Sequence, residues 1–144
     1  MKKYKGVSTW LAVILATTGL TLAGCAGGYT PQNAPESFPC VAEDKLDKTV
    51  AVEAELADLS CSFKRWESME TLHFNVAIKN VSSTPQRYRV NIFLDNGKAV
   101  GGLIPRKTGK GLVKPGETAK AVYPVAQMPK QPKAIILKIG TIGP

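Results

Sequence analysis

The fold is decided by the stretch Thr71-Leu72-His73-Phe74-Asn75-Val76-Ala77-Ile78-Lys79-Asn80, in which apolar and polar residues alternate. Its large apolar residues fall on one side of an extended chain: Leu72, Phe74, Val76 and Ile78. Its polar residues, His73 among them, fall on the other side. Alternation with period two is typical of a half-buried β-strand. The stretch therefore predicts a strand with one face in a core and His73 on the solvent face.

Further strands are expected on the C-terminal side, separated by turns. The alternation repeats over residues 88–94, and Asp95-Asn96-Gly97 supplies the positive-φ residues of a tight hairpin leading into a strand from Lys98 to Ile104. Lys114-Pro115-Gly116-Glu117 has Pro and Gly in the central positions of a type II turn. Strands are then expected at 118–125 and 134–139, and Pro124 places the first of these at a sheet edge.

On the N-terminal side the pattern is less regular. Apolar residues alternate over 50–56 and again over 59–63, with a slip near Asp58 that indicates a bulge or a bend. The competing interpretation is a helix from Asp44 to Leu59, because apolar residues there also recur at helical spacing. The β-branched residues favour the strand.

Several short strands with frequent turns predict an all-β protein, an immunoglobulin-like antiparallel β-sandwich of about seven strands. The turns resemble those of FxLYD-type and related immunoglobulin-like domains of bacterial envelope proteins. The shared features are an apolar strand ending in Asn80-Val81-Ser82, a strand carrying Tyr88, the Asp-x-Gly hairpin and the Pro-Gly-Glu turn. The resemblance covers roughly residues 71–139 and implies the fold.

The N-terminus carries an export pattern. Lys2, Lys3 and Lys5 precede a run without charge from Val7 to Ala23, which is the arrangement of a signal peptide. The run ends in Leu22-Ala23-Gly24-Cys25, which resembles the lipobox of bacterial lipoprotein precursors. That resemblance implies removal of residues 1–24 and acylation of Cys25, which anchors the mature protein in a membrane. The alternative is a transmembrane helix, for which the run is short and diluted by Ser, Thr and Gly.

The mature chain divides into a tether and a domain. Residues 25–39 contain the lipidated cysteine followed by a stretch poor in aliphatic side chains, which predicts a flexible tether. The sandwich is expected to occupy residues 40–144. Ala26 is not the aspartate that retains enteric lipoproteins in the inner membrane, so the resemblance implies the outer membrane facing the periplasm. In a cell with one membrane, the same chain would sit outside the cytoplasmic membrane.

Two cysteines remain once Cys25 is lipidated. Cys40 and Cys61 are a pair in an exported protein, where the compartment oxidises thiols, so a disulfide between them is expected. The alternative is two unpaired thiols.

The charge is uneven along the chain. The formal net charge is +8, and only Asp95 and Glu117 are acidic after residue 71. Such a surface suits anionic lipid headgroups or an acidic protein partner, although it also fits an ordinary solvated surface. The candidate binding surface comprises a basic loop together with an aromatic residue that alternatively caps the core: Arg106, Lys107, Lys110, Lys114 and Trp66.

No chemistry is predicted. His73 is the only histidine, which is too few for the usual metal site, and no Gly-x-Ser-x-Gly frame presents a serine. The Gly101-Gly102 pair does not fit a phosphate-binding loop and is expected to form a bulge. Aromatic residues are not interleaved with the cations, which argues against nucleic-acid binding. No cofactor and no small-molecule substrate are expected.

The sequence therefore indicates an envelope lipoprotein that acts by binding, as a component of a larger envelope complex. One alternative is a chaperone or pilotin that lends a sheet edge to a secretion subunit. Another is an enzyme with a polar pocket around His73 or the segment from Gly101 to Lys110.

Overall fold

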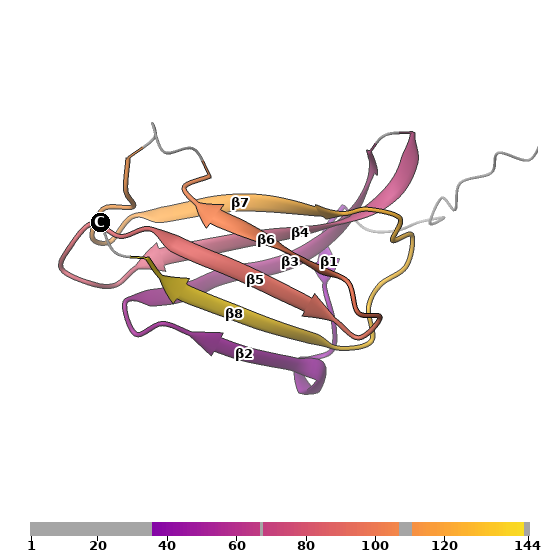
Figure 1. Cartoon of the computed structure of the whole chain (residues 1–144), viewed down its shortest axis with the longest axis horizontal. Helices are drawn as coiled ribbons and strands as arrows, with labels where there is room; N and C mark the ends of the chain where they lie inside the picture. Colours follow the sequence, from indigo (N-terminus) through magenta and orange to yellow (C-terminus); the bar gives the residue numbers. More distant parts are fainter. Residues whose placement is uncertain (1–35, 67, 107–110, 143–144) are drawn as a thin grey trace, which may run out of the picture.

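The structure is a computed structural model that describes residues 36–66, 68–106 and 111–142. These residues form two four-stranded β-sheets that pack face to face (Figure 1). Sheet A has the strand order β1-β3-β4-β7, with bounds Phe38–Pro39, Ala54–Trp66, Met69–Asn80 and Thr118–Val125. Sheet B has the order β2-β8-β5-β6, with bounds Leu46–Val50, Ile135–Thr141, Tyr88–Leu94 and Ala99–Ile104. The predicted all-β sandwich is confirmed.

The core lies between the sheets and is built from the alternating strands. The apolar side of β4 is fully buried, and so is the facing side of β5, including Tyr88. The alternate residues Ile135, Leu137 and Ile139 of β8 fill the same layer. Period-two patterning thus specifies which side of each strand enters the core.

Two details of the sandwich differ from the prediction. The described residues form eight strands where about seven were expected, because Phe38 and Pro39 pair with β3 as a two-residue strand. The pair β2–β8 is parallel, whereas every other named pair is antiparallel. Sheet B is therefore mixed, because the chain enters it at β2 and returns in the same direction at β8.

The strand interpretation of residues 44–59 is confirmed, with one correction. A short 3₁₀ turn, η1 at Glu43–Lys45, is the only helical element among the described residues, and β2 and β3 follow it. A register shift between Leu56 and Asp58 confirms the predicted slip. The alternation over residues 50–56 implies that Val52 shares one strand face with its apolar neighbours. This expectation is wrong, because the chain turns between β2 and β3 and leaves Val52 90% exposed.

Both predicted turns form, although Gly97 alone of Asp95, Asn96 and Gly97 adopts positive φ. Gly97 has φ +80° in the β5–β6 hairpin, where its N–H donates to the carbonyl of Leu94. Gly116 has φ +75°, and the N–H of Glu117 donates to the carbonyl of Lys114 at 3.0 Å. Glycine occupies this region without a steric penalty, so each turn is specified locally.

The glycine pair in β6 does not form the expected bulge. The β5–β6 register runs without a shift through Asn91–Gly101 and Val90–Gly102. A Cβ at Gly101 would collide with the carbonyl oxygen of Val90, and one at Gly102 would lie 3.3 Å from the Cε1 atom of Tyr123. The glycines therefore allow close approach of backbone and ring within a regular ladder.

The predicted disulfide between Cys40 and Cys61 is confirmed. Their Cα atoms are 4.9 Å apart, and the bond attaches the segment after β1 to the buried side of β3. Beside it, the rings of Phe38 and Phe63 stack with centroids 5.4 Å apart. The N-terminal edge of sheet A is thus held by a covalent bond and an aromatic contact.

Asn80 organises the end of β4. Its side chain is completely buried and donates to the carbonyls of Thr84 and Val113, both at 2.8 Å. Its Oδ1 accepts the backbone N–H of Ser82 at 2.9 Å and the hydroxyl of Ser82 at 2.7 Å. Every donor and acceptor of the amide is used, so the Asn-x-Ser motif is explained as a structural joint.

Candidate binding surface

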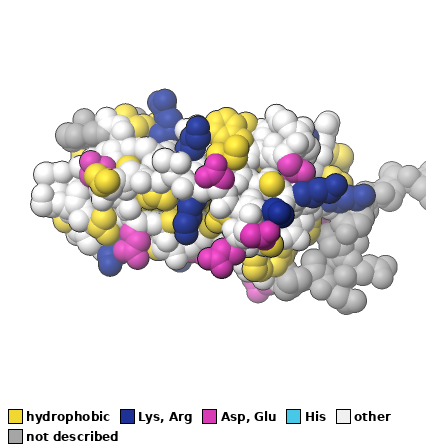
Figure 2. Space-filling model, turned by 90° about the horizontal axis from the view of Figure 1, so that it is seen from below, with side chains coloured by type: hydrophobic (Ala, Val, Ile, Leu, Met, Phe, Trp, Pro, Cys, Tyr) yellow, Lys and Arg dark blue, Asp and Glu magenta, His cyan; other side chains and the backbone are white. Residues whose placement is uncertain are grey.

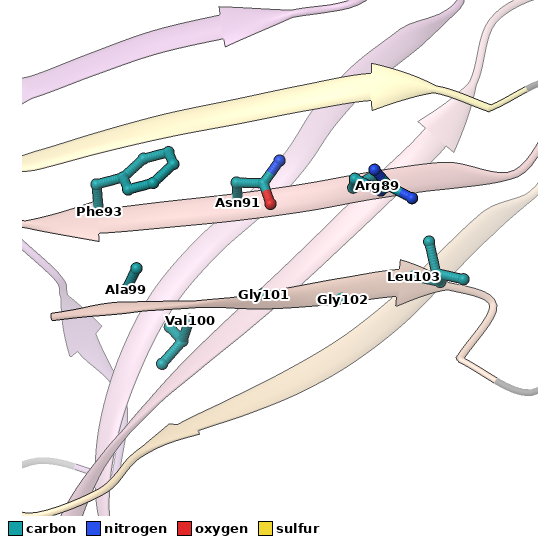
Figure 3. A pocket seen from close by; sticks show the side chains of 8 residues that line it. All are labelled: Arg89, Asn91, Phe93, Ala99, Val100, Gly101, Gly102 and Leu103. Carbon is teal, nitrogen blue, oxygen red and sulfur yellow. The ribbon is translucent and has the colours of Figure 1, made fainter.

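The strongest candidate surface is the outer face of sheet B. Among the described residues, no further element packs on this face, and Figure 3 shows Arg89, Asn91 and Phe93 in sequence along β5. Two shallow depressions meet there and share Arg89 and Asn91. One lies over β5 and β6 and the other over β5 and β8. The polar side of β5, which alternation assigned to solvent, is therefore the centre of this surface.

Glycines make the depressions. Asn91 is in register with Gly101 of β6, and Arg89 is in register with Gly140 of β8. A Cβ at Gly140 would meet no atom within 4 Å, so the space beside Arg89 is open. Each polar side chain thus lies next to a position without a side chain, which leaves its donors accessible to a ligand.

One end of the same face is apolar. Phe93 and Ile136 are in register on neighbouring strands and are 42% and 43% exposed. The Nζ atom of Lys138 lies 6.0 Å from the centroid of the Phe93 ring. Aromatic residues and arginine are enriched in protein interfaces, and Phe93 lies on the same face of β5 as Arg89.

Lys98 and Arg106 lie at the two ends of β6. Lys98 Nζ donates to the carbonyl of Ala126 at 2.6 Å, and Arg106 Nη1 donates to the carbonyl of Val122 at 3.1 Å. Both cations are therefore held against β7 and the turn that follows it. The only ion pair in the described part of the chain joins Lys45 to Asp44, so neither Lys98 nor Arg106 has a carboxylate partner there.

Charge is distributed by strand order. The sheets stack with β6 beside β7 at one edge and β2 beside β3 at the other. Acidic and basic residues are equal in number on β2 and β3, whereas the β6–β7 side contains Lys98, Arg106 and Lys120. On the face seen in Figure 2, acidic and basic side chains are interspersed. The charge asymmetry of the sequence thus becomes a basic edge at β6 and β7.

Tyr123 is buried beneath Arg106. The guanidinium carbon of Arg106 lies 5.7 Å from the ring centroid, in cation–π geometry. The Tyr123 side chain is 2% exposed and its hydroxyl has no hydrogen-bond partner. Burial raises the pKa of this phenol to about 12, and the positive charge of Arg106 acts in the opposite direction. The ring therefore serves packing at neutral pH.

His73 is not on an open surface, contrary to the expectation from alternation. Its side chain points away from the core but is only 5% exposed, and its Nδ1 lies 2.9 Å from the carbonyl oxygen of Thr71. Its register neighbours are Ser62 on β3 and Pro124 on β7, so it sits on an inner strand of sheet A. Alternation alone therefore does not predict how exposed this side chain is.

The predicted candidate residues are not gathered into one patch by the described structure. Arg106 turns back onto β7, and Lys114 begins the turn before β7, where its N–H donates to Glu117 Oε2 at 3.0 Å. The backbone of Trp66 pairs with Met69 at the end of β3. Lys107, Lys110 and Cys25, the predicted lipidation site, lie outside the described residues.

Residues 36–66, 68–106 and 111–142 contain no group of three or more His, Cys, Asp or Glu side chains placed to hold a metal ion. Within the same ranges, no helix is long and apolar enough to cross a membrane.

Comparison with models of known protein families, with curated proteins and with solved structures found no match. The function proposed below is therefore based on the fold and on the geometry of this surface.

Proposed function

We propose that the protein is a membrane-anchored envelope lipoprotein whose sandwich is a non-catalytic binding or assembly component of a larger envelope complex. The anchor is the acylated Cys25, and the FxLYD-like turn chemistry is consistent with an envelope domain. The single observation that supports binding is the outer face of sheet B, where two open depressions share Arg89 and Asn91 and the exposed ring of Phe93 lines one of them. Placement on the periplasmic face of the outer membrane is part of the same proposal.

The anchor is tested by Cys25→Ser. We expect the wild-type protein to sediment with membranes and to incorporate labelled palmitate. The variant should remain unlabelled and keep its uncleaved signal, because the peptidase requires the lipidated cysteine. Palmitate labelling of the variant would overturn the lipid assignment. Separation of inner and outer membranes on a density gradient then tests the predicted location.

The binding face is tested with a photo-crosslinking amino acid at position 93 in cells. The matched control carries the same amino acid at Val52, which is even more exposed but lies in the turn between β2 and β3. We expect a discrete crosslinked protein from position 93 and none of the same mass from position 52. Equal products from both positions would contradict a specific face.

The second candidate function is a chaperone or pilotin-like factor for a secretion or surface subunit. It is favoured by β6, an edge strand of sheet B without charged residues or proline. The two functions differ in what happens to the partner. A client of a chaperone loses steady-state abundance when this protein is deleted, whereas a partner in a complex keeps its abundance but fails to assemble.

A further inference from the structure

The edge strand β6 lacks the features that normally prevent edge pairing. Exposed edges are usually protected by short length, charge, proline or a bulge. Among the four edges, β1 has two residues, β2 contains Asp47 and Lys48, and β7 contains Lys120 and Pro124. β6 reads Ala-Val-Gly-Gly-Leu-Ile over six residues and keeps a regular register with β5.

The hairpin fixes which backbone groups of β6 are unpaired. The N–H of Leu94 donates to the carbonyl of Lys98 at 2.9 Å, so Leu94 and Lys98 form a hydrogen-bonded pair. Pairs alternate along an antiparallel ladder, and the next pair, Phe93–Ala99, is therefore of the non-hydrogen-bonded kind. The N–H and C=O groups of Ala99, Gly101 and Leu103 consequently point away from β5, toward the free edge.

The charges beside this edge indicate the partner. Lys98 and Arg106 flank β6 at its two ends and have no carboxylate partner in the described part of the chain. A second copy pairing antiparallel through Gly101 and Gly102 would bring Lys98 of one chain toward Arg106 of the other. Like charges opposite one another are unfavourable. An acidic segment would satisfy both cations.

We propose that β6 accepts an extended segment of a partner protein as an additional strand of sheet B, and that acidic residues flank the paired stretch of this segment. The proposal rests on the proposed binding function and names its mode of recognition. Backbone hydrogen bonds to Ala99, Gly101 and Leu103 hold the segment, and Lys98 and Arg106 set its position. Ala99, Gly101 and Gly102 leave room for side chains of the added strand.

The first experiment uses a defined probe and the full mature protein in lipid nanodiscs. The probe is the capped peptide Glu-Glu-Thr-Val-Thr-Val-Thr-Glu-Glu with a fluorophore, and binding is measured by anisotropy. One control replaces every Glu by Lys, and another carries N-methyl groups along its central stretch. We expect each control to bind at least about tenfold more weakly, since each removes one of the two recognition elements. Equal binding of the N-methylated peptide would overturn strand addition.

Variants locate the site. Ala99→Pro removes an outward N–H without removing a bond of the β5–β6 ladder, and Ala99→Val is its matched control because it retains that N–H. We expect the proline variant to lose about tenfold in peptide affinity and the valine variant to bind like the wild type, with both folded by circular dichroism. The double variant Lys98→Glu and Arg106→Glu should prefer the Lys peptide. Failure of this reversal would overturn the assignment of acidic flanks.

A last pair of measurements separates this inference from the proposed function. If in-cell crosslinking from position 93 persists in Ala99→Pro and disappears in Arg89→Ala, the binding face stands and strand addition at β6 is wrong. If analytical ultracentrifugation shows wild-type dimers that Ala99→Pro abolishes, the occupant is a second copy and the acidic partner is wrong. Loss of both peptide binding and crosslinking in Ala99→Pro supports the inference.

Discussion

The hydroxyl of Tyr88 donates a 2.9 Å hydrogen bond to the backbone carbonyl of Glu53, and this bond ties β5 of sheet B to the turn between β2 and β3. Tyr123 on β7 of sheet A carries the same phenol, but its buried hydroxyl has no partner. The two tyrosines are equally hidden from solvent and differ in whether the polar group is satisfied. Substitution by phenylalanine is therefore expected to destabilise the fold at Tyr88 but not at Tyr123.

Tyr88→Phe is expected to lower the free energy of unfolding by about 1 kcal/mol. The change removes one hydrogen bond and leaves the carbonyl of Glu53 without that partner. Urea denaturation followed by circular dichroism measures the effect. A variant as stable as the wild type would show that this bond contributes nothing to the junction.

Tyr123→Phe is expected to leave stability unchanged or to raise it by up to about 1 kcal/mol. The hydroxyl is desolvated in the fold without compensation, and phenylalanine removes that cost while keeping the ring under Arg106. The same urea titration serves as the measurement. A loss comparable to that of Tyr88→Phe would contradict an unsatisfied hydroxyl.

Stability is expected to fall at alkaline pH because of Tyr123. Its pKa is raised from 10.0 to about 12 in the fold by burial. Above pH 10 the unfolded chain loses the phenol proton while the folded chain retains it, so the unfolded state is favoured as pH rises. Tyr123 therefore does not lower the stability of the fold below pH 10. It lowers this stability progressively as the pH approaches about 12. Unfolding titrations at neutral pH and above pH 10 should show a smaller alkaline loss in Tyr123→Phe.

Gly101→Ala is expected to destabilise the fold by about 2 kcal/mol or more, because the added methyl group would collide with the carbonyl of Val90. Gly140→Ala is the matched control. It lies on the same face of sheet B, and a Cβ there would meet nothing within 4 Å. Thermal unfolding of the two variants should show a clear decrease in Tm for the first and almost none for the second.

Removal of the disulfide is expected to lower the free energy of unfolding by about 3 kcal/mol, as the chain-entropy model gives for a loop of this size. Cys40 and Cys61 are separated by 21 residues. The measurement compares the wild type with and without reductant, and the Cys40→Ala, Cys61→Ala variant provides the control. Reductant should shift the wild type and have no effect on the variant.

Much of the fold could be predicted from the sequence because its signals are local. Alternation in residues 71–80 and 88–94 specified which side chains enter the core, and the glycines at 97 and 116 specified two turns. The same reasoning failed at Val52, where one apparent strand is divided between two sheets. It also failed at His73, whose side chain is buried on the side of β4 that alternation assigned to solvent.

The candidate site was less predictable. The sequence drew attention to a basic loop, of which Arg106 is described and turns onto β7. The polar side of β5 was visible as an alternation, yet nothing local distinguished Arg89 and Asn91 from ordinary solvated residues. Their significance comes from Gly140 and Gly101 in register beside them.

By itself, the sequence determined the all-β class, the faces of the strands, the turns and the cysteine pair available for a disulfide, because each depends on the alternation or identity of residues close together in the chain. Only the tertiary structure decided that β6 is an edge without protection, that Lys98 and Arg106 lie at its two ends, and that Tyr123 is buried beneath Arg106. These relationships depend on strand order and register. Both are set by long-range packing of the two sheets, which a local pattern does not encode.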